Sequence, residues 1–255
     1  MNKRKPFRLG LIAFVGAIAG IQTASASLIL ETFQPFSGTG LGTVPTIVTF
    51  QNNGTETGCF GSNGAGNALV GGACTSGGDT KPGASQTNLQ PLSTAGITSA
   101  ANFGLVFNAV QPSGGPLDVT NITVAFYDST GKFIYQSSGL FCQNSAGGII
   151  VPSGSGCLLM DTAQGTGNSG FLATLDPAQQ QAATAAGAFS STGNLVGVSA
   201  AAGGPGGASA GGSETIFLAN SGGGNVSTVP EPMSVLLSGV GLLGLALLRR
   251  RAYLR

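Results

Sequence analysis

The chain of 255 residues contains no histidine and no tryptophan, and only 7% of its residues carry a formal charge. Without histidine, the sequence lacks the commonest general base, the commonest metal ligand and every Ser–His or Cys–His nucleophile pair. The absence of tryptophan, with only three tyrosines present, leaves few aromatic rings that could stack on sugars. We therefore predict a protein that is not an enzyme, with no catalytic residue, no cofactor and no metal site.

Positive charge is almost missing from the middle of the chain. Between positions 27 and 228 there are eight acidic residues and two basic ones, Lys81 and Lys132, so this segment has a net charge of −6 although the whole chain has +1. An acidic, lysine-poor segment cannot neutralise phosphates, so we predict no nucleic-acid partner. The other basic residues lie within the first eight and the last seven positions. The two ends therefore have a role of their own.

The first 26 residues have the order of a secretory signal peptide. A basic start is followed by an apolar stretch over residues 9–21 and by the small residues Ala24 and Ala26. We predict that signal peptidase cleaves after Ala26, which makes Ser27 the first residue of the exported protein. A retained membrane helix is the alternative, but it needs about 20 apolar residues, and this stretch has thirteen with three glycines among them.

The other end combines a Pro-Glu-Pro motif, an uncharged apolar run and an arginine cluster. Residues 233–248 carry no charge, and a helix of that length reaches about 24 Å across a hydrocarbon core of about 30 Å. The arginines at 249–251 stay on the cytoplasmic side, which leaves the body outside. Pro230 and Pro232 on either side of Glu231 oppose a helix and favour extended backbone, which a protease can recognise.

This arrangement resembles the PEP-CTERM sorting signal of exported bacterial proteins. The resemblance covers about 23 of the 255 residues, and its specific part is the order of the three elements. It implies recognition by exosortase, a membrane-embedded enzyme that removes the tail, and a transient inner-membrane anchor over residues 233–248. It also implies transfer to the cell surface or extracellular matrix of a Gram-negative bacterium. The recognised residues are Pro230, Glu231, Pro232, Arg249, Arg250 and Arg251. An ordinary single-pass anchor is the alternative.

The body, residues 27–228, consists of short β-rich runs separated by Gly, Ser, Asn and Pro, and shows almost no helical periodicity. We predict one all-β domain, a jelly-roll-like β-sandwich with glycine-rich loops and one short helix. The segment 104–220 also looks like parts of PEP-CTERM passenger domains, which implies an extracellular β-domain. The expected strands are 28–33, 44–51, 104–110, 119–127, 132–136, 158–161, 171–175, 195–200 and 215–219.

The run from 119 to 136 predicts a β-hairpin with its turn at residues 128–131. Alternation places Val124 and Phe126 on one face. Unless a bulge shifts the register, Tyr127 and Tyr135 lie together on the other face. Packing on the sheet is the simpler interpretation of this tyrosine pair, and a glycan contact is the alternative.

One helix is predicted after residue 175. Asp176 can cap it, Pro177 suits the first helical position, and Gln179 is placed to complete a capping box. Gly187 is the expected end.

The four cysteines fall into two pairs with equal spacing. Cys59 and Cys74 are fifteen positions apart, and so are Cys142 and Cys157. Equal spacing and an oxidising exterior favour these two disulfides over the other two pairings that four cysteines allow. Each closed loop would contribute about 3 kcal/mol to stability. A four-cysteine zinc site is the alternative, but such sites usually have cysteines two to four residues apart.

These features together predict a secreted protein with a structural or adhesive role in exopolysaccharide and biofilm. Its partners are signal peptidase and exosortase during export, with exopolysaccharide as a further partner. A carbohydrate-binding module is the alternative. A polysaccharide hydrolase ranks third, because it needs two carboxylates about 5–9.5 Å apart, and nothing in the sequence brings Asp118 and Asp128 together.

Overall fold

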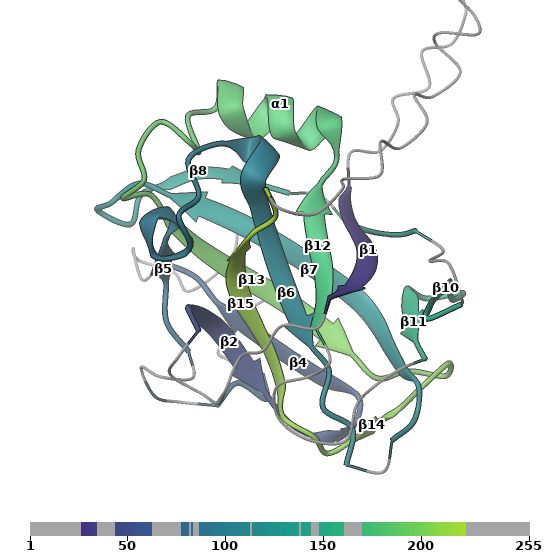
Figure 1. Cartoon of the computed structure of the whole chain (residues 1–255). Coiled ribbons are helices and arrows are strands. Elements are labelled where there is room, and N and C mark those ends of the chain that lie inside the picture. The colour runs from purple at the N-terminus through teal and green to yellow at the C-terminus, as the bar shows by residue number, and fades with distance from the viewer. Residues whose placement is uncertain are drawn as a thin grey trace, which may run out of the picture.

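The part of the chain that the structure describes is mostly β, with one α-helix and two short 3-10 helices (Figure 1). The predicted all-β class with one helix is therefore confirmed. The predicted leader and sorting signal lie outside the described residues, and within the part described no helix is long and apolar enough to cross a membrane. The computed structural model describes residues 27–34, 44–62, 78–81, 83, 87–112, 114–137, 139–143, 148–160 and 170–222.

The first large sheet has six strands in the order β2-β15-β6-β12-β1-β9. Neighbouring strands run antiparallel, except that β9 runs parallel to β1. Its strands are β1 (Leu28–Gln34), β2 (Thr46–Phe50), β6 (Phe103–Asn108), β9 (Leu140–Cys142), β12 (Gly170–Leu175) and β15 (Glu214–Asn220).

The second large sheet has seven strands, all paired antiparallel. Five follow the order β10-β11-β7-β13-β4, while β5 pairs with β13 and β8 with β7. These strands are β4 (Glu56–Phe60), β5 (Gln90–Pro91), β7 (Leu117–Tyr127), β8 (Phe133–Gln136), β10 (Ile150–Pro152), β11 (Cys157–Leu159) and β13 (Leu195–Ala202). A small third sheet joins β3 (Asn53–Gly54) to β14 (Ser209–Ala210).

One hydrophobic core contains inward-facing residues from both large sheets. Phe103 of the six-stranded sheet contacts Phe126 of the seven-stranded sheet, with ring centroids 5.1 Å apart. Val124 joins Phe126 in this core, whereas Ala125 and Tyr127 form a small cluster on the opposite face of β7. The alternation predicted for this strand is therefore confirmed.

The exception allowed for in the predicted hairpin occurs, because a bulge shifts the register of β7 and β8. The pairing shifts between Phe126 and Tyr127, so Tyr135 lies opposite Phe126 and Phe133 lies opposite Tyr127. A bulge puts two residues of one strand against one of the other and turns the following side chains to the other face. Tyr135 consequently packs against the core, away from Tyr127.

The helix α1 (Pro177–Ala185) begins as predicted, with Pro177 in its first turn and Asp176 as its N-cap. The predicted capping box is wrong. The backbone N–H of Asp176 donates to the carbonyl of Ser27, and the side-chain oxygen of Gln179 accepts a hydrogen bond from the Tyr135 hydroxyl. Gly187 follows the helix with φ +90°, a conformation that glycine adopts without steric cost. In Figure 1, α1 and β14 lie at opposite ends of the molecule.

Candidate functional site

Most residues of the predicted sorting and cleavage sites lie outside the described residues: Pro230, Glu231, Pro232, Arg249, Arg250, Arg251, Ala24 and Ala26. Their roles stay predictions. Ser27, the residue after the predicted cleavage point, is described and is half-buried.

Ser27 is bound to Asp176. Ser27 immediately precedes Leu28, the first residue of β1, which pairs with Leu175 at the end of β12. The backbone N–H of Ser27 donates to Asp176 Oδ2, and its carbonyl accepts from the Asp176 N–H at 3.2 Å. Asp176 Oδ1 accepts from the backbone N–H of Gln179 at 2.7 Å. One carboxylate therefore serves both the helix N-terminus and the start of β1.

The two tyrosines proposed as a glycan contact lie on opposite faces of the hairpin. Tyr127 is 3% exposed. Burial raises the pKa of its hydroxyl, which lies against the backbone of Ser62. Tyr135 is partly buried against the core, and its hydroxyl donates to Gln179. The shared surface expected from sequence is therefore not formed by this pair, and the glycan contact itself stays a prediction.

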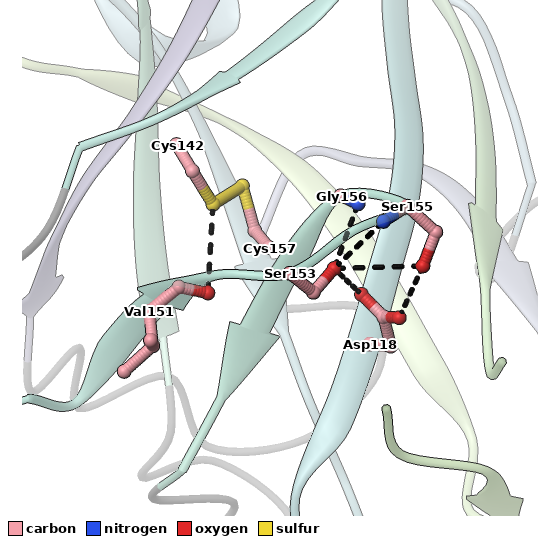
Figure 2. Close-up of a disulfide and its surroundings, with 7 residues drawn as sticks. All are labelled: Asp118, Cys142, Val151, Ser153, Ser155, Gly156 and Cys157. Atoms are coloured by element: carbon pink, nitrogen blue, oxygen red, sulfur yellow. Dashed lines mark hydrogen bonds between the residues drawn. A yellow bond between two sulfur atoms is a disulfide. The ribbon is translucent and has the colours of Figure 1, made fainter. Parts of the chain in front are cut away.

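The predicted Cys142–Cys157 disulfide is present, with the two Cα atoms 5.4 Å apart (Figure 2). It joins β9 at the end of the six-stranded sheet to β11 in the seven-stranded sheet, so it links the two sheets covalently. Cys59 also takes part in a disulfide. Cys74, its predicted partner, lies outside the described residues.

Beside this disulfide, a buried carboxylate fixes the turn between β10 and β11. Asp118 is fully buried and accepts hydrogen bonds from the hydroxyls of Ser153, at 2.7 Å, and Ser155, at 2.6 Å (Figure 2). Ser153 Oγ in turn accepts from the backbone N–H of Gly156 at 2.7 Å. Asp118 thus orders the turn that precedes Cys157.

The structure does not bring Asp118 and Asp128 together. Asp118 lies near the start of β7 and Asp128 directly after its end. Ten residues of extended strand separate them by about 30 Å, whereas paired glycosidase carboxylates lie within about 9.5 Å. Asp128 instead holds its own turn, where it accepts from the backbone of Thr130 and of Lys132.

Sequence analysis missed a second pair of acids, Glu56 and Glu214. Glu56 begins β4 and Glu214 begins β15, so the two side chains come from different sheets. They are 1% and 0% exposed. Glu214 Oε1 accepts from Gln111 Nε2 at 2.7 Å, and Glu56 Oε2 accepts from the Asn52 N–H at 2.9 Å. We call these two residues the acid pair.

Burial disfavours a full charge on both acids of the pair. Glu56 Oε1 and Glu214 Oε2 are buried without a hydrogen-bond partner among the described residues. Two buried carboxylates that were both ionised would repel each other, so the pair favours a protonated acid. Burial, together with the neighbouring Glu56 carboxyl, raises the pKa of Glu214 to about 10. Burial also raises the pKa of Glu56, and the negative charge of Asp79 adds to that rise.

A signal for Glu214 exists in the sequence. Alternation along β15 places Glu214 on the same face as Ile216 and Leu218, both of which belong to the core. A glutamate in phase with core residues indicates a buried carboxyl. Nothing in the sequence identifies Glu56, 158 positions earlier, as its partner.

The burial of the acid pair favours a structural role. A substrate could not reach carboxyl groups that are at most 1% exposed. The two acids instead come from different sheets and are both buried, which suits a role in the fold. No protein-family model, curated protein or solved structure matches this chain.

Proposed function

We propose that this protein is exported, is processed at both ends, and takes a structural or adhesive role at the cell surface or in the exopolysaccharide matrix of a biofilm. The observation that carries the proposal is the order Pro-Glu-Pro at 230–232, uncharged run at 233–248 and arginines at 249–251, at the opposite end from a signal-peptide-like leader. Exosortase is the proposed processing enzyme. The Cys142–Cys157 disulfide supports an oxidising destination.

We further propose that the body is a jelly-roll β-sandwich. Eight strands carry this assignment, and in chain order they are β2, β4, β6, β7, β11, β12, β13 and β15. The first pairs with the eighth, the second with the seventh, the third with the sixth and the fourth with the fifth, always antiparallel. This is the pattern of one long two-stranded ribbon rolled up on itself, which gives the two facing sheets of a jelly roll.

The role proposed for the body is passive because four of its described acids hold the fold together. Glu56, Glu214 and Asp118 are each at most 1% exposed, and Asp128 holds a turn. A matrix protein needs a durable fold more than a reactive group. Saturable binding of a soluble exopolysaccharide to the purified protein would favour a carbohydrate-binding module instead, and hydrolysis of that polysaccharide would overturn the non-enzymatic role.

The sorting proposal is tested with tail variants of the full chain in a host that has an exosortase. We expect Glu231→Ala, and separately deletion of residues 249–251, to leave the tail attached and the protein in the membrane fraction. Thr228→Ala, three residues before Glu231, is the matched control and should be processed normally. If both tail variants give the same mature mass and location as the wild type, the proposal is wrong.

A further inference from the structure

We infer that Asp176 is the binding site for the α-ammonium group that signal-peptide cleavage creates at Ser27, so that processing adds an ion pair to the folded protein. This inference rests on the proposed export and on cleavage after Ala26. Hydrolysis of the Ala26–Ser27 amide consumes one water molecule and leaves a carboxylate on Ala26 and an ammonium group on Ser27. In the uncut chain, the same nitrogen is a neutral amide with one N–H.

The position of this nitrogen is set by the sheet. Ser27 and Asp176 extend the antiparallel pairing of β1 with β12 by one residue, because Leu28 pairs with Leu175 and the Ser27 carbonyl accepts from the Asp176 N–H at 3.2 Å. The Leu28 N–H is also bound, to the Gly139 carbonyl at 3.1 Å. The first residue of the processed chain is therefore held before any charge appears.

The carboxylate faces the nitrogen directly. Asp176 Oδ2 accepts from the Ser27 N–H, while Oδ1 accepts from the Gln179 N–H at the start of α1. The N-terminus of a helix carries partial positive charge and repels a cation. Because the carboxylate lies between the helix and Ser27, it offsets this repulsion, and a charge-assisted hydrogen bond replaces a neutral donor.

The charge of Asp176 also acts on Tyr135. Burial raises the pKa of the Tyr135 hydroxyl, and the negative charge of Asp176 raises it further. Before cleavage, no ion pair to Asp176 is found among the described residues, and its charge is met by backbone N–H groups alone. Cleavage supplies the missing cation at the place where the structure already holds a donor.

The test measures how readily the Ser27 α-amine reacts with trace acetic anhydride at pH 7. The full-length chain is expressed with its leader in a Gram-negative host, and mass spectrometry of the processed protein maps its first residue and compares labelling of Ser27 with labelling of Lys81. Only the unprotonated amine reacts, so an ion pair slows labelling. We expect Asp176→Asn to speed labelling of Ser27 by roughly two- to fivefold, the range for an ion pair near the surface.

Asp176→Asn is a suitable variant because asparagine caps helices about as well as aspartate, so the charge is removed while the cap is kept. Asp128→Asn removes an exposed charge whose carboxylate accepts hydrogen bonds within its own turn, and it should leave the labelling ratio unchanged. Equal labelling of Ser27 in the wild type and Asp176→Asn would overturn the inference, and so would a processed chain that starts at another residue. Neither outcome affects the export proposal, which is tested separately by the processing and location of the chain and its tail variants.

Discussion

The two large sheets are joined at opposite ends of their strand order by different chemistry. On the side of β9 and β11, the Cys142–Cys157 disulfide provides a covalent link. On the side of β15 and β4, Glu214 and Glu56 provide a buried acid pair. The disulfide needs an oxidising environment and should be insensitive to pH. The acid pair should be insensitive to reductants but needs a protonated carboxyl group. The two links should therefore break under different conditions.

Removal of one acid should have the largest effect on this comparison. Glu214→Ala leaves Glu56 without its buried partner and Gln111 without its acceptor, and we expect it to lower the free energy of unfolding by about 3–5 kcal/mol. Urea denaturation at pH 6 measures this loss. Glu214→Gln is the matched control, because its amide can donate to Glu56 and its oxygen can still accept from Gln111. Equal losses for alanine and glutamine would show that the hydrogen bond from Gln111 to this side chain contributes nothing.

Removal of the disulfide should lower the free energy of unfolding slightly less than Glu214→Ala does. The Cys142–Cys157 disulfide closes a loop with a sequence separation of 15, so the double variant Cys142→Ser/Cys157→Ser should lose about 3 kcal/mol of unfolding free energy in the same urea assay. The pH dependence of its stability should match that of the wild type. A changed pH dependence would mean that the two links are not independent.

The acid pair should make the protein less stable as pH rises. The pKa of Glu214 is raised from 4.5 to about 10 by burial. Its favourable contribution is therefore fully present below about pH 4.5 and is lost as pH rises towards 10. Glu31 and Glu56, whose pKa values burial also raises, act in the same direction. One proton gives a slope of at most about 1.4 kcal/mol per pH unit.

Urea midpoints between pH 5 and pH 9 measure that slope. The wild type should lose stability across this range, and Glu214→Gln, which cannot ionise, should lose less. Glu31→Gln is the matched control, because Glu31 is a buried glutamate that accepts from Thr174 at 2.8 Å in the same sheet. It should flatten the slope by a smaller amount. A pH slope for Glu214→Gln as steep as that of the wild type would contradict the raised pKa of Glu214.

The smallest effect is expected away from both links. Tyr135→Phe removes the hydroxyl that donates to Gln179 but keeps the ring in contact with Phe126, whose centroid is 6.3 Å away. We expect a loss of about 1 kcal/mol in the urea assay, with no change in sensitivity to pH or reductant. No loss would show that the hydroxyl is equally well satisfied by water.

Short β-rich runs bounded by Gly, Ser, Asn and Pro made most strands predictable. Each predicted strand overlaps an observed one, from β1 to β15. β4 was missed because its sequence Glu-Thr-Gly-Cys-Phe puts a glutamate and a glycine on the inward face. β9 and β10, three residues each, are too short to show a period. The bulge in the hairpin could be allowed for but not located, since it leaves no mark in the alternation of a four-residue strand.

The site residues divide according to sequence separation. The helix cap at Asp176 and the Cys142–Cys157 pair could be predicted, because cap chemistry and cysteine spacing are local signals. The acid pair and the contact between Ser27 and Asp176 join residues about 150 positions apart. Only the order of the strands in the rolled sheets brings such residues together, and no short segment of sequence predicts that order.

The central claim is that both ends are removed during export, and it is tested most directly by the intact mass and cellular fraction of the native protein, with and without its exosortase. We predict a surface or matrix protein that begins at Ser27 and lacks residues 233–255, and, without exosortase, a membrane-bound protein that keeps them. Recovery of the complete 25.0 kDa chain from the cytosol in both strains would contradict the account.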